Sequence, residues 1–333
     1  MPTTLTARAR LLFVVSLLAT SFCHAAEKTS SGALAIGLIA TGTVEQTVQS
    51  WKPLTEALSH ELQRRVEIVA SKDYADIAKA AKEGRVQVVW VSNKVAIELV
   101  EPEIMTVFAQ MVRKDGALGY KSLLLVPQES PLRSVDDLVA RPGAFRLAAG
   151  SEKSVSGYLV PNYYVFAKRK VDLTKHFSAV QRGSHRENFI SLAEGKVDIA
   201  TNNTEEMPRY KAEMPDKLSK VRVLWESPLI PNDPILYRKD MAPALQQQVK
   251  RFFVAYGRSP AEKAVLDRIN GLGGFKASGN YQLRPVVDLE LFEALTRAMS
   301  TKANAPEAFG AEMQRLTQRA SRLDVLMTAS RVD

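Results

Sequence analysis

The stretch GSEKSVSGYLVP, residues 150–161, brings two serines, Ser154 and Ser156, to the start of a long apolar and aromatic run. Serine hydroxyls at the start of a helix accept hydrogen bonds from backbone N–H groups that have no partner within the helix. The same N–H groups and hydroxyls bind an anion where they are left open, because the N-terminus of a helix carries partial positive charge. The stretch therefore predicts either a helix cap or an anion-binding turn.

Other polar side chains lie at the ends of predicted strands, which is where ligands bind in open α/β sheets. Structural explanations exist for all of them: Asp233 precedes a proline in a turn, Glu205 is an acid in the first turn of a helix, and the remaining side chains fit loop or core positions. Position alone therefore does not decide between a structural role and a ligand-binding role. The residues in question are Tyr74, Trp90, Asn93, Tyr120, His185, Glu205 and Asp233.

A hydrolase is one alternative, because Ser154 or Ser156 together with His185 and Asp233 supplies the residue types of a catalytic triad. The turn lacks the glycine of a G-x-S-x-G nucleophile elbow, since Ser154 stands two residues before Ser156. The sequence therefore favours binding over catalysis, and no catalytic residue is expected.

A metal site is not expected either. The histidines His60, His176 and His185 lack the spacing of metal ligands, and the one cysteine, Cys23, lies in the N-terminal segment. If that segment is removed as a signal peptide, the mature chain has no disulfide, thiol nucleophile or cysteine-based metal site. We predict neither a metal nor a cofactor.

Residues 1–26 have the pattern of a secretory signal peptide. Two arginines precede an apolar run over residues 11–22, and the small residues that follow predict cleavage near Ala25 or Ala26. The run is too short to span a bilayer, and the bulky residue before the cysteine disfavours a lipoprotein. We expect a soluble periplasmic protein.

The chain is basic, with a formal net charge of +9. Its lysines and arginines are dispersed, without a basic stripe or a nucleic-acid-binding motif, so nucleic acid is not an expected partner. A basic surface around an anion site, or one that meets a membrane protein, explains the charge as well.

The elements that must position these residues alternate between strand and helix. Residues 33–40 (ALAIGLIA) read as a buried strand, and an apolar stripe at helical spacing follows over 44–62, with a kink or restart expected at Pro53. Asp73 is expected to cap a helix that ends at Gly84. Strands separated by helices predict a mainly parallel sheet covered on both faces.

A helix–glycine–strand unit recurs along the chain, as EGRVQVVW (83–90) and EGKVDIAT (194–201), and predicts two lobes built alike. Proline-rich segments at 126–134 and 226–234 mark the expected crossings between the lobes. The predicted division is a signal peptide over 1–26, a discontinuous first lobe over 27–126 and 238–333, and a second lobe over 127–237.

The tail from about residue 286 is predicted to be helical. Its apolar stripe packs on the first lobe in one interpretation and forms a homodimer contact in the other. The stripe consists of Leu316, Ala320, Leu323 and Met327.

Several longer blocks carry a family resemblance that spans essentially the whole mature chain. They include SVSGYLVPNYYVFAK (154–168), VDIATNNTE (197–205), VRVLWESPLIPNDPILYRKD (221–240) and FFVAYGRSPAEKAVLDRI (252–269). In this order they resemble the periplasmic phosphonate-binding proteins of ABC uptake systems, within the phosphate/phosphite/phosphonate substrate-binding family. The resemblance implies an α/β fold of the type II periplasmic-binding class, with two lobes, a hinge, a ligand cleft and C-terminal helices.

The resemblance also assigns site residues. The family's phosphonate-holding S-T-S turn falls on Ser154, Val155 and Ser156, so valine replaces the threonine. The same end of the ligand is expected to meet His185 and Tyr120. The ligand's amino end is expected to meet Glu205, Asp233 and Tyr74, and the expected cleft lining includes Trp90 and Asn93.

Two further positions depart from the family. Val91 stands where an aromatic residue often follows the strand tryptophan, and Lys121 follows the tyrosine where another aromatic is usual. These changes, with Val155, bear on the choice of ligand.

The resemblance implies a binding protein that captures a phosphonate and delivers it to an ABC permease. Two carboxylates near a bare dianion would repel it, so a cationic group at the other end, as in 2-aminoethylphosphonate, is favoured. The alternatives are binding of phosphite, phosphate or a sulfonate, and service as the sensing subunit of a receptor.

Overall fold

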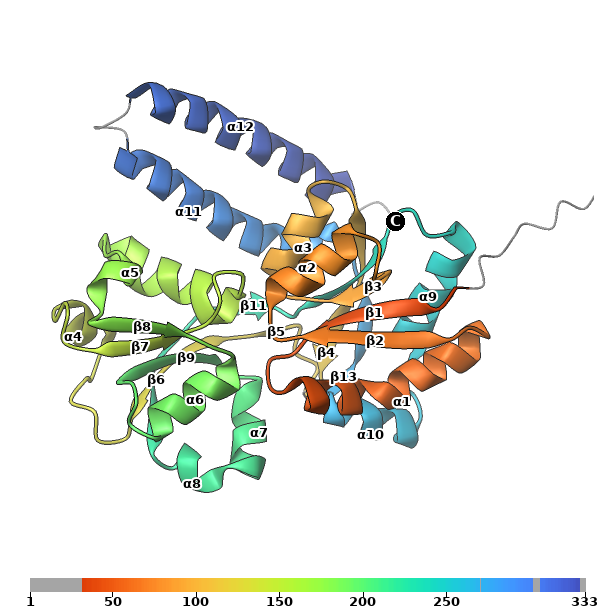
Figure 1. Cartoon of the computed structure of the whole chain (residues 1–333), viewed down its shortest axis with the longest axis horizontal. Coiled ribbons are helices and arrows are strands. Elements are labelled where there is room, and N and C mark those ends of the chain that lie inside the picture. The colour runs from red at the N-terminus through yellow and green to blue at the C-terminus, as the bar shows by residue number, and fades with distance from the viewer. Residues whose placement is uncertain (1–31, 270, 302–305, 330–333) are drawn as a thin grey trace, which may run out of the picture. The chain divides into compact units, whose positions relative to one another are not determined.

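Two β-sheets and a small two-stranded ribbon form the fold in the computed structural model, which describes residues 32–333 apart from 270, 302–305 and 330–333 (Figure 1). The predicted signal peptide and its cleavage point lie outside the described residues. We use "first lobe" for the elements on the six-stranded sheet and "second lobe" for those on the five-stranded sheet.

The first sheet has the strand order β13-β4-β12-β3-β1-β2. Strand β1 pairs in parallel with β2 and β3, as predicted, and its residues are all buried. The other three pairs of this sheet are antiparallel, so the prediction of a mainly parallel sheet is wrong for the sheet as a whole. The strands are β1 (Leu34–Ile39), β2 (Val66–Ser71), β3 (Val88–Trp90), β4 (Met105–Arg113), β12 (Pro234–Arg238) and β13 (Leu272–Ala277).

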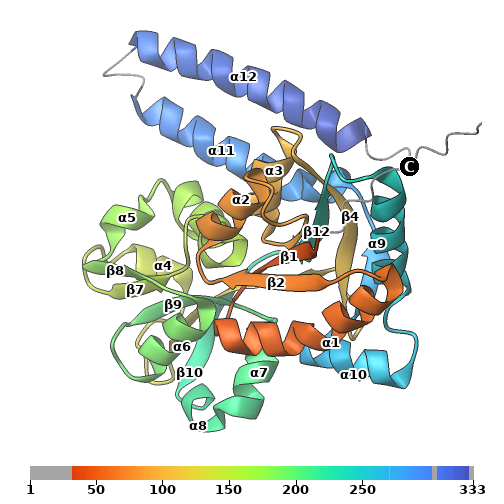
Figure 2. The same ribbon diagram turned by 45° about the vertical axis from the view of Figure 1, so that its right-hand side comes forward.

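Helices cover both faces of the first sheet (Figure 2). One face packs against α2 (Tyr74–Lys82) and α3 (Asn93–Val100). The opposite face packs against α1 (Val44–Leu62), α9 (Pro243–Ala255) and α10 (Pro260–Arg268).

Of the kink or restart expected at Pro53, the restart is wrong, because α1 runs through the proline without a break, while the kink stays a prediction. The residues on either side of the proline, Trp51, Leu54 and Leu58, are fully or almost fully buried against the sheet. Burial of three large side chains offsets the one backbone hydrogen bond that a proline removes.

The second sheet has the order β10-β6-β9-β7-β8, with β7 parallel to β8 and β9. Its strands are β6 (Ser122–Pro127), β7 (Arg146–Ala149), β8 (Ala179–Arg182), β9 (Ile199–Asn203) and β10 (Val221–Glu226). Its helices are α4 (Val135–Val139), α5 (Leu173–His176), α6 (His185–Ala193), α7 (Glu206–Glu213) and α8 (Pro215–Leu218).

Both predicted helix–glycine–strand units are present. Gly84 and Gly195 have φ angles of 74° and 72°, and each leads from a helix towards a buried strand, β3 or β9. A left-handed residue after a helix favours glycine, because it has no Cβ to clash. The two lobes therefore share this unit.

The two crossings between the sheets lie side by side in a ribbon formed by β5 (Gly119–Tyr120) and β11 (Ile230–Pro231) (Figure 1). The ribbon is so close that a Cβ added at Gly119 would lie 2.5 Å from the carbonyl oxygen of Ile230. Strand β6 already belongs to the second sheet and β12 to the first, so the chain changes sheets a few residues before the predicted limits. The proline-rich segments mark turns near the crossings; the lobe limits themselves stay a prediction.

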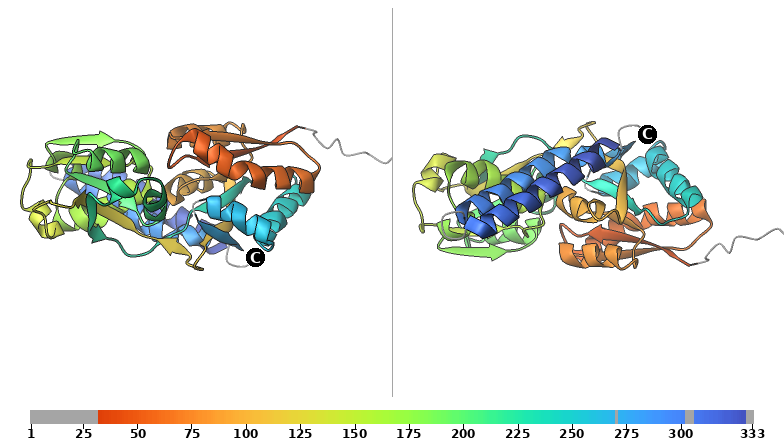
Figure 3. Two further views of the ribbon diagram at one scale, coloured as in Figure 1. Left: turned by 90° about the horizontal axis from the view of Figure 1, so that it is seen from below. Right: turned by 90° about the horizontal axis from the view of Figure 1, so that it is seen from above.

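The C-terminal helices α11 (Arg284–Thr301) and α12 (Pro306–Ala329) form a hairpin that runs from the first lobe towards the second (Figure 3). Of the predicted stripe, Leu323 and Met327 are buried in the core of the first lobe, while the homodimer contact stays a prediction. Phe292 contacts the ring of Tyr163 in the second lobe, with ring centroids 4.8 Å apart. Among the described helices, none has an apolar stretch of the length that a membrane span requires.

Candidate ligand-binding site

The stretch that follows β7 forms a capped helical turn. The Ser154 hydroxyl accepts a hydrogen bond from the backbone N–H of Gly157 at 3.0 Å, and a π-helical turn spans Val155–Leu159. The backbone N–H of Gly150 donates to the carbonyl of Gly157 at 2.9 Å, which closes the turn on the strand. The predicted cap is therefore present, and π-helical turns of this kind are frequent at functional sites.

Ser156 and His185 meet in the buried interior of this turn. The Ser156 Oγ lies 3.3 Å from the Nε2 of His185 and 3.4 Å from the Nδ2 of Asn203. Burial lowers the pKa of His185 to about 4, so its ring is neutral at pH 7. A neutral imidazole can donate through one nitrogen to an anion without carrying a charge into the interior.

Two tyrosines lie against the same serines. Tyr74, the first residue of α2, interacts with Ser154, and Tyr120 interacts with Ser156. Burial raises the pKa of both tyrosines above its usual value, so each hydroxyl keeps its proton at neutral pH. The site therefore gathers hydroxyl groups that can donate to an anion.

A cavity of about 660 Å³ opens beside this group, between the two lobes. Tyr74 and Thr41 line it from the first lobe, and Ser154, Arg182 and His185 line it from the second. Of the residues predicted for the phosphonate end, Ser154 and His185 line this cavity, while Ser156 contacts His185 and Tyr120 interacts with Ser156.

The two predicted acids are half-buried, and both interact with Tyr120. Asp233 follows β11 and accepts a hydrogen bond from the Nδ2 of Asn93 at 3.2 Å. Burial raises the pKa of Asp233 well above its usual value, and the nearby carboxylate of Glu205 raises it further. Asn93 also donates to the carbonyl of Pro231 at 2.9 Å, and so holds Asp233 beside the ribbon.

Glu205 forms an ion pair that the sequence did not predict. Its Oε1 lies 3.1 Å from the Nη1 of Arg113, at the end of β4. Burial raises the pKa of Glu205 to about 7, although Arg113 opposes the shift. The position of Arg113 at the end of a strand was the signal that could have drawn attention to it.

Glu206, the first residue of α7, was also missed. It is buried, accepts a hydrogen bond from the Thr41 hydroxyl at 2.9 Å and pairs with Arg209. Glu206 therefore joins the two lobes beside Glu205.

Trp90, which was predicted to line the cleft, is almost fully buried, with 4% of its surface exposed. Its ring stacks on Trp51 with centroids 5.4 Å apart. Both tryptophans, with Arg113 and Glu205, line a second cavity of about 710 Å³. Thr41 lines this cavity as well as the first one, so the two cavities adjoin the same buried site.

The three departures from the family do not present side chains to the cavities described above. Val91 and Val155 are buried in the apolar core of the first lobe, and Lys121 pairs with Glu226 at the surface. The Val155 side chain thus corrects the expectation from the S-T-S comparison, which had it facing the ligand.

Val155→Thr is accordingly expected to lower the free energy of unfolding by about 1–3 kcal/mol, because it buries a hydroxyl among apolar side chains. Phosphonate affinities should not change. Thermal denaturation and calorimetry would measure both quantities, with Val325→Thr, at a position that is 64% exposed, as the matched control. Tighter phosphonate binding by Val155→Thr would show that the side chain reaches the ligand.

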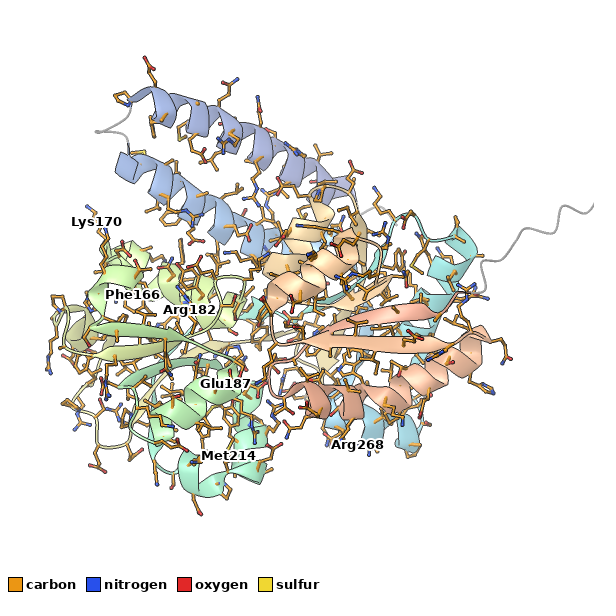
Figure 4. All side chains as sticks on the ribbon, in the orientation of Figure 1. Phe166, Lys170, Arg182, Glu187, Met214 and Arg268 are labelled. Carbon is orange, nitrogen blue, oxygen red and sulfur yellow. The ribbon has the colours of Figure 1, made fainter. Side chains whose placement is uncertain are left out.

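The two lobes contact each other across the first cavity. Lys72 and Glu187 form an ion pair at 2.7 Å, and Figure 4 shows Glu187 where α6 faces the first lobe. The Ser92 hydroxyl donates to the carbonyl of Lys153 at 2.9 Å. These two contacts join the lobes beside the cavity.

Comparisons with known proteins agree with the resemblance. A family model described as the periplasmic phosphonate substrate-binding protein of ABC transporters matches residues 36–283. The chain is 37% identical over 279 residues to the phosphonates-binding periplasmic protein of Escherichia coli (strain K12), with 84% of this chain and 81% of the relative covered.

Solved structures agree as well. The binding-protein component of an ABC phosphonate transporter from Pseudomonas aeruginosa is 33% identical, with a TM-score of 0.79 over 88% of this chain and 99% of the other. A Prochlorococcus marinus (MIT 9301) protein solved in complex with methylphosphonate is 20% identical, with a TM-score of 0.70 over 78% of this chain and 97% of the other. The second likeness is one of fold.

The matched family consists of substrate-binding proteins and not of enzymes. In agreement with this, the described contacts leave the hydrolase triad incomplete, since Asp233 is held by Asn93 while His185 contacts Ser156. The two-lobe fold and the sequence blocks lead to the same assignment: the chain belongs to the family of periplasmic phosphonate-binding proteins of ABC transporters.

Proposed function

We propose that this phosphonate-binding protein captures 2-aminoethylphosphonate and delivers it to an ABC permease. The observation that carries the proposal is the meeting of two unlike groups in one buried site. Hydroxyl and N–H donors at the Ser154–Ser156 turn lie at one end, and the carboxyl groups of Glu205 and Asp233 lie at the other.

The donor end suits a phosphonate group. A phosphonate has three acceptor oxygens and close to two negative charges, which several convergent donors satisfy. Ser154, Ser156, His185 and Tyr120 offer such donors, and Tyr120 also interacts with Asp233 of the acidic end. The residues that the family resemblance implied for this end therefore support the proposal.

The acidic end favours a ligand with a positive charge. Two like charges 4 Å apart repel each other by about 4 kcal/mol at an effective dielectric constant of about 20. A bare dianion such as phosphate or phosphite would meet that repulsion from Asp233 and Glu205 whenever their carboxyl groups are ionised. An ammonium two carbons away from the phosphorus would instead be attracted, and we expect Tyr74 and Asp233 to complete its surroundings.

Delivery would follow from closure of the lobes. A ligand that touches both lobes stabilises the closed form, and a permease that binds the closed form then distinguishes loaded from empty protein. Contacts such as Lys72–Glu187 would break when the cleft opens.

The protein would work in the periplasm after its signal peptide is cleaved near Ala25 or Ala26. Mass spectrometry of the exported protein would test this prediction. A full-length or lipid-modified chain would contradict it.

A calorimetric panel tests the choice of ligand. We expect 2-aminoethylphosphonate to bind more tightly than methylphosphonate, phosphite, phosphate and taurine, and to be recovered without change. Tighter binding of phosphite, phosphate or taurine would replace the proposed ligand. Release of a product that stops in Ser156→Ala would instead indicate a hydrolase.

A further inference from the structure

The cavity of about 710 Å³ beside Glu205, here called the distal cavity, contains more N–H donors than an ammonium group requires. An ammonium is itself a donor and needs only acceptors. The lining nevertheless includes the N–H donors of Trp90, Arg113 and Arg209, together with other polar side chains and the carboxyl groups of Glu213 and Asp267.

Arg113 has donors to spare. Its side chain is only 15% exposed, and its Nη1 donates to Glu205 at 3.1 Å. Within the described part of the chain, Glu205 is the one side-chain acceptor recorded for this guanidinium. A guanidinium has five N–H groups in a planar fork, so most of its donors stay open for a second acceptor.

Two other N–H donors of the cavity lining also have no acceptor recorded among the residues that the structure describes. The indole Nε1 of Trp90 and the Nε of Arg209 are buried, and neither has an acceptor among the described residues. A buried donor without a partner is costly. Because both nitrogens are covered by neighbouring atoms, Arg113 is the donor on which an acceptor in the cavity would act.

We propose that the distal cavity receives a carboxylate of the ligand, so that the preferred substrates are phosphonates that carry an α-amino acid group. This inference rests on the proposed function. The ammonium would face Glu205 and the carboxylate would face Arg113, so a zwitterionic end would match the two members of this ion pair. The planar fork of an arginine fits a carboxylate through two parallel hydrogen bonds.

The simplest such ligand is 2-amino-3-phosphonopropionate. It has the same two carbons between phosphorus and nitrogen as 2-aminoethylphosphonate, and it differs by one carboxylate on the carbon that bears the ammonium. The two compounds therefore form a matched pair that isolates the carboxylate. In the alternative, Arg113 is only a counter-ion that neutralises Glu205. The carboxylate of the ligand would then bring no gain in affinity.

Calorimetry with this pair decides between the two roles. We expect the wild-type protein to bind 2-amino-3-phosphonopropionate at least about tenfold more tightly than 2-aminoethylphosphonate, the gain of one charge-assisted interaction. Arg113→Ala should abolish that preference, and Arg113→Lys, which keeps the charge without the fork, should retain part of it. Arg258→Ala, at an exposed arginine outside both cavities, is the control and should keep the full ratio.

Equal or weaker binding of the amino acid by the wild-type protein would overturn the inference, and so would an unchanged ratio in Arg113→Ala. Melting curves would identify a variant that fails to fold, and the result then rests on the wild-type ratio and on Arg113→Lys. Absence of binding by every phosphonate tested would instead contradict the proposed function, so the two failures are distinguishable.

Discussion

Gly157→Ala is expected to weaken the binding of every phosphonate by more than about tenfold, because it disrupts the turn at the donor end of the site. A Cβ at this position would lie 2.7 Å from the Ser154 Oγ and 2.9 Å from the Cα of Gly150. The Gly150 contact is with backbone, so the turn must move away from β7 to relieve it. Overpacking of this kind also lowers the free energy of unfolding, by about 1–3 kcal/mol.

Gly310→Ala provides the matched control. Gly310 lies on the exposed surface of α12, and apart from its own helix backbone a Cβ there would have no heavy atom of the described residues within 4 Å. Alanine should stabilise this helix by about 0.5–1 kcal/mol and leave phosphonate affinity unchanged. Calorimetry and thermal denaturation of both variants measure the contrast. Wild-type affinity in Gly157→Ala would show that the turn does not hold the ligand.

Glu205→Gln is expected to weaken the binding of 2-aminoethylphosphonate by about 1.5–3 kcal/mol, the range for a hydrogen bond to a charged group. Methylphosphonate has no ammonium, so its affinity should change little or improve. The amide keeps an oxygen that can accept from Arg113, which limits the disturbance of the free protein. Equal losses for both ligands in calorimetry would indicate that Glu205 has a structural role.

The same residue predicts a dependence on pH. With a pKa of about 7, Glu205 is about half protonated in neutral solution, and an ammonium favours its ionised form. Binding of 2-aminoethylphosphonate should therefore release protons, and the affinity should rise as the pH rises through about 7. Calorimetry in two buffers with different heats of ionisation measures the release. The part due to Glu205 is the difference from Glu205→Gln; an identical release in both proteins would contradict the assignment.

The first lobe was largely predictable because its signals are local. The buried strand at 33–40 and the Asp73 cap depend on neighbours within a few residues, and the structure contains both. The continuity of α1 through Pro53 was not predictable, since it depends on burial against a sheet whose strands come from distant segments. The antiparallel strands β12 and β13 escaped prediction for the same reason.

The site divides in a similar way. Family motifs identified the serine turn and the two acids, because these residues lie in long recognisable blocks. The partner of Glu205 could not be read from any block, because Arg113 is 92 residues away along the chain. The orientation of the Val155 side chain could not be predicted either, because the flanking serines do not indicate whether it faces the core or the ligand.

The ribbon of β5 and β11 determines which contacts can change when the lobes separate. Rotation about an axis displaces each atom in proportion to its distance from that axis. Tyr120 belongs to the ribbon and Asp233 lies two residues after it, so both would move little in such a rotation. The Lys72–Glu187 pair lies outside the ribbon, because it joins α6 to the segment before α2. Residues near the axis would keep their places in the open form and so influence the association rate, whereas contacts at the rim would form only on closure and so influence the dissociation rate. Association and dissociation rates, measured separately, would report on different parts of the same cleft.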